Sequence, residues 1–171
     1  MNEHYILISL GSNIEREKHT RAGVNALSQM FADIEVSSVY ESESVGFAGA
    51  AFYNLVVGAY TDKSVIEVCQ VLKKIEQDNG RKRSEKKFAS RTLDLDLLTY
   101  DSLVISSPVV LPREEILHNA FVLQPLAELV PKHQHPVLGE TYQQMWQAYD
   151  KSKQKLWPVV FDWSSPRYDA I

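Results

Sequence analysis

Two aspartates spaced two residues apart are the residues of this sequence best suited to chemistry. In the stretch SRTLDLDLLTYD, Asp94 and Asp96 alternate with Leu93, Leu95 and Leu97, the pattern of a strand with one buried face. Side chains two apart on a strand begin about 6 to 7 Å from each other, so two carboxylates can hold Mg²⁺ together with phosphate oxygens. The alternative is a solvated pair that protects a strand edge from aggregation.

A basic segment lies directly before this strand. Six of the 18 Lys and Arg residues fall within eleven positions: Arg81, Lys82, Arg83, Lys86, Lys87 and Arg91. Such a run can be an ordinary solvated surface. A long polar loop is more often functional, however, and arginine forks beside metal-binding carboxylates suit a polyphosphate. We therefore interpret the two segments together as a nucleoside triphosphate site.

A third candidate segment is AFYNLVV. If it forms a strand, Phe52 and Asn54 share one face, and Tyr53 and Leu55 share the other. An aromatic plane beside an amide that donates and accepts hydrogen bonds suits a flat heterocycle with a mixed polar edge. The alternative is that these aromatic residues belong to the core.

The elements that position these residues are predicted in the order β, α, β, β, α, β. Strands are predicted over 5–10, 34–42 and 52–60 and in the segment that carries the two aspartates, with helices over about 14–31 and 64–80. This order predicts an α+β, ferredoxin-like antiparallel sheet with helices packed on one face. Asp94 and Asp96 then project from the other face. The segment 111–131 predicts a turn and short helices as C-terminal additions.

The helix boundaries rest on capping residues. Asn13 is the expected N-cap of the first helix, which buries the stripe Ala22, Ala26, Leu27, Met30 and Phe31. In the second helix, Ser64 and Glu67 have capping-box spacing, and Gly80 marks the end.

Composition narrows the class of protein. A chain of 171 residues with 44% hydrophobic and 23% charged residues predicts one domain over 1–171. The net charge of −4 argues against nucleic-acid or membrane-surface partners. A single cysteine, Cys69, and no recognisable export signal or membrane span favour the cytoplasm.

The motifs GSN, FYN, GRKR, SRTLDLDLLTY, LP and FVLQPLAELVP come in the order of a known family. Over about residues 5–135 the chain resembles the 6-hydroxymethyl-7,8-dihydropterin pyrophosphokinases of folate synthesis. The resemblance implies a ferredoxin-like fold and transfer of the β,γ-pyrophosphoryl group of MgATP to the pterin hydroxymethyl oxygen, which releases AMP.

The resemblance also implies roles for individual residues. Asp94 and Asp96 would bind two Mg²⁺ ions, and Arg81, Arg83 and Arg91 would grip phosphates. Asn54 would bond the pterin edge between the rings of Phe52 and Phe121. Val45 would line this pocket through its backbone, and Glu76 would support it. Loops over 46–51 and 81–90 would close over the substrates.

The chain departs from the family pattern in the loop before the aspartates and at two positions that contact ATP in the family. Lys87 to Arg91 replace the usual R-W-G-P-R, which alters the backbone freedom of the loop. Arg113 and Asn119 stand where the family has an ATP-binding histidine and arginine. These departures leave a pterin-binding paralogue with weak or no kinase activity as an alternative. A palm-type nucleotidyl-transferring domain is a second alternative, which the acidic charge disfavours.

Two further segments are interpreted as structural. His133 and His135 lie in KHQHP, which predicts a surface loop and not a metal site, because no third ligand is near. The tail over 150–171, with Trp157 and Trp163, predicts an irregular strand. Its aromatic residues could serve an oligomer, so a monomer or weak homodimer is expected.

Overall fold

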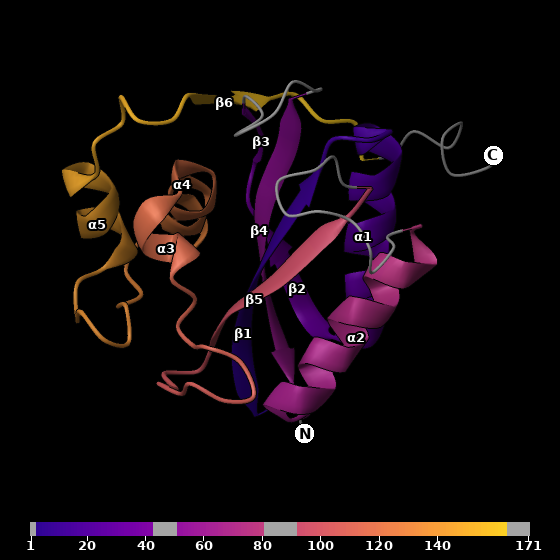
Figure 1. Cartoon of the computed structure of the whole chain (residues 1–171), viewed down its shortest axis with the longest axis horizontal. Helices are drawn as coiled ribbons and strands as arrows, with labels where there is room; N and C mark the ends of the chain where they lie inside the picture. The colour runs from indigo at the N-terminus through magenta and orange to yellow at the C-terminus, as the bar shows by residue number, and fades with distance from the viewer. Residues whose placement is uncertain (1–2, 43–50, 81–91, 164–171) are drawn as a thin grey trace.

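An antiparallel sheet lies between two groups of helices (Figure 1). The structure is a computed structural model that describes residues 3–42, 51–80 and 92–163. Its elements are β1 (His4–Ser12), α1 (Arg16–Met30), β2 (Ala32–Val36), β3 (Val39–Ser42), β4 (Phe52–Thr61), α2 (Val65–Asp78), β5 (Asp94–Tyr100), α3 (Glu115–His118), α4 (Ala120–Leu129), α5 (Tyr142–Ala148) and β6 (Leu156–Val159). Helices α1 and α2 lie on one side of the sheet, and α3, α4 and α5 lie on the other (Figure 1).

The strand order confirms the ferredoxin-like prediction. Neighbouring strands follow the order β5, β1, β4, β3, β6, and β2 also pairs with β4. β1 is antiparallel to both β4 and β5, so the first strand of the chain runs between the two strands that carry the candidate residues.

The strand expected over 34–42 is in fact divided into β2 and β3. At the break, the Ser37 amide donates to the Val56 carbonyl and the Ser37 hydroxyl accepts from the Val56 amide, both at 2.9 Å. The next residue, Ser38, donates through its hydroxyl to Glu128 of α4 at 2.6 Å. Two serines that bond local backbone and a distant carboxylate thus interrupt the ladder, which the apolar pattern alone did not indicate.

The first helix begins later than predicted, and Asn13 is not its N-cap. β1 continues to Ser12 because Gly11 and Ser12 remain paired with β4. The helix starts at Arg16, and its N-cap residue Glu15 has a φ of 41° and no side-chain capping bond. The GSN motif therefore extends the strand by two residues before the chain turns.

The buried stripe of α1 is only partly as expected. Leu27 and Phe31 are buried, but Met30 is 42% exposed. Gly23 faces the sheet instead, where an added Cβ would lie 2.9 Å from Leu10 Cδ1. Close contact between this helix and β1 therefore depends on a glycine, which the apolar pattern did not include.

The end signals of α2 are confirmed. The Ser64 hydroxyl accepts from the Glu67 amide at 3.2 Å, and the Glu67 carboxylate accepts from the Ser64 amide at 2.9 Å. The helix ends at Asp78, and Gly80 follows with a φ of 88°. This conformation is one that glycine adopts without steric cost.

The two faces of the sheet bury separate cores. Leu27, Leu72 and Leu95 belong to the core under α1 and α2. Leu98 and Leu123 belong to the core between the sheet and α4 and α5. The C-terminal additions thus cover part of the second face, which makes this an α+β sandwich of helices around one sheet.

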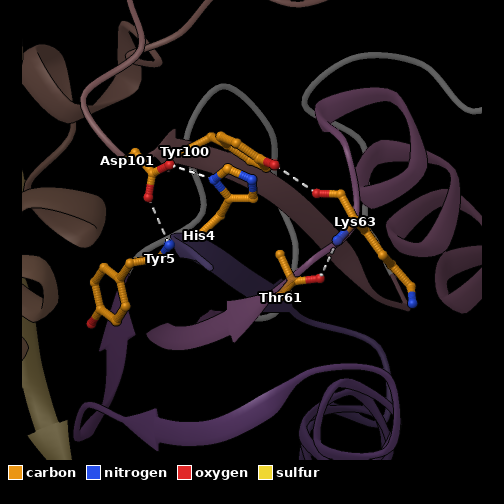
Figure 2. Close-up of polar contacts among 6 residues, drawn as sticks. All are labelled: His4, Tyr5, Thr61, Lys63, Tyr100 and Asp101. Carbon is orange, nitrogen blue, oxygen red and sulfur yellow. Dashed lines mark hydrogen bonds and ion pairs between the residues drawn. The ribbon is translucent and has the colours of Figure 1, made fainter. Parts of the chain in front are cut away.

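Side chains connect the start of β1 with the end of β5, on the side of the sheet away from Asp94 (Figure 2). Asp101 accepts from the Tyr5 amide at 2.8 Å and lies 2.7 Å from His4 Nδ1. The Tyr100 hydroxyl donates to the Lys63 carbonyl at 2.6 Å. The contacts of Asp101 hold the start of β1 to the end of β5, and the bond of Tyr100 joins β5 to the segment between β4 and α2.

The loop between α4 and α5 is mostly exposed, as expected, but His135 within it is buried. His135 is only 3% exposed, and its Nδ1 accepts from the amides of Val137 and Leu138 at 3.2 and 3.1 Å. Burial lowers the pKa of His135 below its ordinary value. The neutral imidazole is therefore part of the loop structure, because a protonated Nδ1 could not accept these bonds.

We predict that acid weakens the fold partly through His135. The unfolded chain takes up a proton near the ordinary histidine pKa of about 6.5, whereas the folded imidazole resists it, so stability is present above that pH and falls below it. Thermal midpoints between pH 7.5 and 5 should therefore fall more steeply in the wild type than in His135→Gln. The exposed His118→Gln is the matched control and should keep the wild-type slope; equal slopes in all three proteins would contradict this role.

Candidate functional site

The two aspartates of β5 lie on the face predicted for them. Leu95 and Leu97 point into the core under α1 and α2, so the alternation places Asp94 and Asp96 on the opposite face. Both aspartates are half-buried. The leucines therefore anchor the strand while the carboxylates remain accessible at its edge.

Glu76 supports this strand from the side. Its carboxylate, near the end of α2, accepts from the Leu95 amide at 2.8 Å. Leu95 lies between the two aspartates, and β5 forms the end of the sheet beyond β1. Glu76 thus satisfies a backbone donor on an edge strand and holds the segment between the aspartates against α2.

Arg113 approaches the same aspartates from the chain that follows β5. Its guanidinium Nη2 lies 3.6 Å from Asp96 Oδ1, and its Nε donates to the Leu97 carbonyl at 3.2 Å. The Arg113 amide also donates to the Leu98 carbonyl at 2.9 Å. A cation is therefore fixed beside Asp96 by three contacts along β5; Asp94, Asp96 and Arg113 are named the β5 cluster below.

The pKa of the Cys69 thiol is affected by two residues of this cluster. Burial raises the pKa of the Cys69 thiol, while the charge of Arg113 lowers it and that of Asp96 raises it again. The thiol on α2 thus lies within electrostatic reach of both residues.

The second group of candidate residues lies on β4. Tyr53 and Leu55 face the core under α1, so Phe52 and Asn54 face the opposite side of the sheet, as predicted. Asn54 is buried and Phe52 is half-buried. Phe52 and Asn54, named the β4 cluster below, thus share a face of the sheet with the β5 cluster.

Asn54 is oriented by a residue that the sequence did not indicate. Its side-chain nitrogen donates to the Ser42 hydroxyl at 2.8 Å, and Ser42 belongs to the adjacent strand β3. Because the amide nitrogen points to β3, the amide oxygen points toward β1. The orientation of this polar edge is therefore set before any ligand binds.

Gly11 of β1 lies between the two clusters. It is the register partner of Asn54 on one side and of Asp94 on the other. Strands are spaced about 4.8 Å apart, so the Cα atoms of Asn54 and Asp94 lie about 10 Å apart across Gly11. An added Cβ on Gly11 would stand 3.0 Å from Asn54 Oδ1 and 3.6 Å from the Phe52 ring. The glycine keeps this surface flat.

Two candidate residues, Phe121 and Asn119, lie at the start of α4, and they make different contacts. Phe121, in the first turn of α4, is half-buried and packs against the core on the site face. Asn119 precedes that helix, and its side-chain oxygen accepts from Gln154 Nε2 at 3.1 Å. Gln154 also accepts from the Ala120 amide at 2.8 Å. Asn119 thus belongs to a contact that holds the start of α4.

Four of the predicted site residues, Val45, Arg81, Arg83 and Arg91, lie outside the described residues. The same is true of both loops expected to close over substrates, apart from Ala51. Within the described ranges 3–42, 51–80 and 92–163, no group of three or more His, Cys, Asp or Glu side chains could hold a metal ion. In those ranges no helix has the length and apolar character needed to cross a membrane.

Comparison with solved structures defines the class of fold. The chain superposes on the crystal structure of wild-type Plasmodium falciparum HPPK-DHPS with a TM-score of 0.68 and 14% identity, over 88% of this chain and 46% of that one. An HPPK-DHPS in complex with substrates gives a TM-score of 0.71 over 88% of this chain and 44% of that one. The chain is thus a ferredoxin-like α+β domain that spans less than half the length of these solved chains.

Comparison of sequences defines the family. The family model for 7,8-dihydro-6-hydroxymethylpterin-pyrophosphokinase (HPPK) matches residues 7–131. The Synechocystis 2-amino-4-hydroxy-6-hydroxymethyldihydropteridine pyrophosphokinase is 35% identical over 92% of this chain and 81% of its own length. The Bacillus subtilis enzyme of that name is 37% identical over 71% of this chain and 75% of its own length. The chain belongs to the HPPK family.

We predict that Glu76 limits the motion of β5. Glu76→Ala removes the acceptor of the Leu95 amide, so hydrogen exchange over residues 94–97 should become faster, with a loss of about 1 to 3 kcal/mol of stability. Glu76→Gln keeps a side-chain oxygen and serves as the control, which should exchange at nearly the wild-type rate. Unchanged exchange in Glu76→Ala would contradict the proposed restraint.

Proposed function

We propose that the chain transfers the β,γ-pyrophosphoryl group of ATP to 6-hydroxymethyl-7,8-dihydropterin, giving AMP and the pterin diphosphate, a step of folate biosynthesis. Membership of the HPPK family supports this reaction. The observation that carries it is the register of Asn54, Gly11 and Asp94 across three adjacent strands. This register brings onto one face of the sheet the cluster that we propose for the ring and the cluster that we propose for the phosphates.

The β5 cluster suits magnesium. Two half-buried carboxylates on one strand face supply the hard oxygen ligands that Mg²⁺ prefers, and the ion takes its remaining ligands from phosphates and water. When bound by Asp94 and Asp96, two Mg²⁺ ions would neutralise phosphate charge and orient the triphosphate.

The β4 cluster suits the pterin. Phe52 offers a half-buried ring, and the fixed amide of Asn54 offers a donor and an acceptor to a heterocycle edge. Phe121 would cover the other face of the ring from α4, and Val45 would complete the pocket through its backbone. Glu76 is proposed to support this pocket, and its bond to the Leu95 amide adds a positioning role for the aspartates.

The remaining basic residues would serve the triphosphate. Arg81, Arg83 and Arg91 are proposed to hold phosphate oxygens by charge-assisted bonds. Arg113, fixed 3.6 Å from Asp96, would add a permanent charge near the same oxygens. Asn119 can offer only an amide, and its oxygen is engaged by Gln154, so its contribution to ATP binding would be weak.

The reaction follows from these positions. The hydroxymethyl oxygen bonds to the β-phosphorus, the bond from that phosphorus to the bridging oxygen of AMP breaks, and the hydroxyl proton is released. Asn54 and Phe52 would hold the pterin so that its hydroxymethyl group faces the β5 cluster. Arg113 would stabilise charge on the transferred group as the bond breaks.

Product analysis tests this function. ATP labelled at the β-phosphorus should give labelled pterin diphosphate and unlabelled AMP, and the release of AMP should require the pterin. Formation of ADP would contradict pyrophosphoryl transfer. Pterin binding without turnover would favour the pterin-binding paralogue, and turnover with a nucleic-acid primer would favour a nucleotidyl transferase.

Three further features belong to the proposal: the domain organisation, the partners and the compartment. Pairing of β6 with β3 joins the segment beyond the family match to the main sheet, which supports one domain over 1–171. Small molecules are the proposed partners of a monomer or weak homodimer. The reduced state expected of Cys69 favours the cytoplasm.

We predict that the aspartates are needed for transfer and not for pterin binding. Asp94→Ala or Asp96→Ala should lower turnover by more than about a hundredfold. The reason is that the variant would no longer hold the metal that stabilises the negative charge of the transition state. Calorimetric titration should give a nearly unchanged Kd for the pterin, since the β4 cluster is intact. Parallel loss of turnover and pterin binding in a folded variant would count against the assignment.

We predict a measurable but weakened use of ATP. Arg113→Ala should lower kcat/KM for ATP by about ten- to a hundredfold, the value of one lost charge-assisted bond of about 1.5 to 3 kcal/mol. Asn119→Arg should raise kcat/KM for ATP by a similar factor. Asn119→Ala, which breaks the Gln154 contact without adding charge, is the control; an equal gain in that variant would refute the electrostatic account.

A further inference from the structure

A chain of polar contacts leads from the C-terminal strand to the residue before Phe52. Trp157 of β6 donates through Nε1 to Glu41 Oε1 at 2.9 Å. The other Glu41 oxygen, Oε2, forms an ion pair with Arg16 Nη2 at 2.6 Å. Arg16 Nη1 then donates to the Ala51 carbonyl at 2.8 Å. The three side chains come from β6, β3 and α1.

Arg16 also contacts β4 through a ring. Its guanidinium carbon lies 4.0 Å from the centroid of Tyr53. Arg16 therefore holds the backbone before Phe52 and the side chain after it. Because Tyr53 points to the α1 side, this grip constrains the strand from the face opposite to Phe52 and Asn54.

Further contacts fix the tail that supplies Trp157. Arg21 of α1 is 2% exposed, and its Nε donates to the Asp162 carbonyl at 2.6 Å. The ring of Phe161 packs edge-on against Tyr53 with centroids 5.8 Å apart. A buried arginine and an aromatic contact thus anchor the tail on α1 and β4, beyond residue 131 where the family match ends.

We infer that Arg16 is a positioning residue for pterin binding and that Trp157 holds Arg16 in place through Glu41. Arg16 sets the backbone from Ala51 to Tyr53, which determines where the Phe52 ring and the Asn54 amide stand. Glu41 neighbours Ser42, the acceptor of the Asn54 amide, so the tail restrains both the strand and its partner. This inference rests on the proposed function, because the β4 cluster is assigned to the pterin.

Substitution of Arg16 tests the inference. Loss of charge-assisted bonds in Arg16→Gln should raise the Kd and KM for the pterin about tenfold, while kcat and the KM for ATP remain near wild type. Arg16→Lys keeps the charge beside Glu41 and should recover part of the pterin affinity. If Arg16 were only structural, its loss would lower the stability and kcat and would affect the pterin and ATP alike, and not the pterin alone.

Substitution of Trp157 tests the distal link. Trp157→Phe removes the indole donor, keeps a smaller aromatic ring, and should weaken pterin binding about two- to threefold. Trp146→Phe, on α5 in the other part of the C-terminal additions, is the control and should leave pterin binding unchanged. Because Trp157 acts only through Glu41 on Arg16, the double variant Arg16→Gln, Trp157→Phe should bind the pterin about as weakly as Arg16→Gln alone.

The outcomes separate this inference from the proposed function. If the wild type does not bind hydroxymethyldihydropterin, the proposed function fails. If the wild type binds it and both Arg16→Gln and Trp157→Phe bind it equally well, the positioning role is wrong. Should Arg16→Gln fail to fold, Trp157→Phe decides: unchanged pterin affinity in that variant refutes the inference.

Discussion

The pairing of β1 with β4 on one edge and β5 on the other determines the relative position of the β4 cluster and the two aspartates of β5. Backbone bonds place Gly11 opposite Asn54 and Asp94, so two side chains far apart in sequence meet across one residue. A slip of one residue would turn Asp94 and Asp96 toward α2, in place of Leu95 and Leu97, which would leave that core. The contacts of Asp101 with His4 and Tyr5 hold the far end of β1 and β5 against such a slip.

The rest of the architecture makes this surface rigid. Leucines on β5 pack under α2, Glu76 holds the Leu95 amide, and Arg113 follows the strand back to Asp96. On the other strand, Asn54 is oriented by Ser42. A site whose side chains come from strands and are held by neighbouring contacts needs little rearrangement to bind a rigid heterocycle. A side chain at position 11 would crowd the Asn54 amide and the Phe52 ring, so the glycine is needed to keep both in these positions.

Much of this arrangement was predictable because it depends on local patterns. Alternation with Leu95 and Leu97 assigned the face of the aspartates, and the capping box of Ser64 assigned the start of α2. Asn13 was misassigned because the pairing of Gly11 with β4 outweighs a local cap signal. The break at Ser37 was missed because its bonds join distant strands. Arg16 could not be identified from the sequence, since its partners Glu41, Ala51 and Tyr53 become neighbours only in the folded sheet.

The central claim is that one surface across β1 binds both the pterin and the metal-bound triphosphate. Mn²⁺ in place of Mg²⁺, with a nonhydrolysable ATP analogue, allows paramagnetic relaxation of bound pterin protons to measure their distance from the metal. With Asn54 and Asp94 about 10 Å apart, the pterin signals should relax strongly, and Asp94→Asn with Asp96→Asn should abolish the effect. A pterin that binds normally but shows no metal-dependent relaxation would contradict the claim.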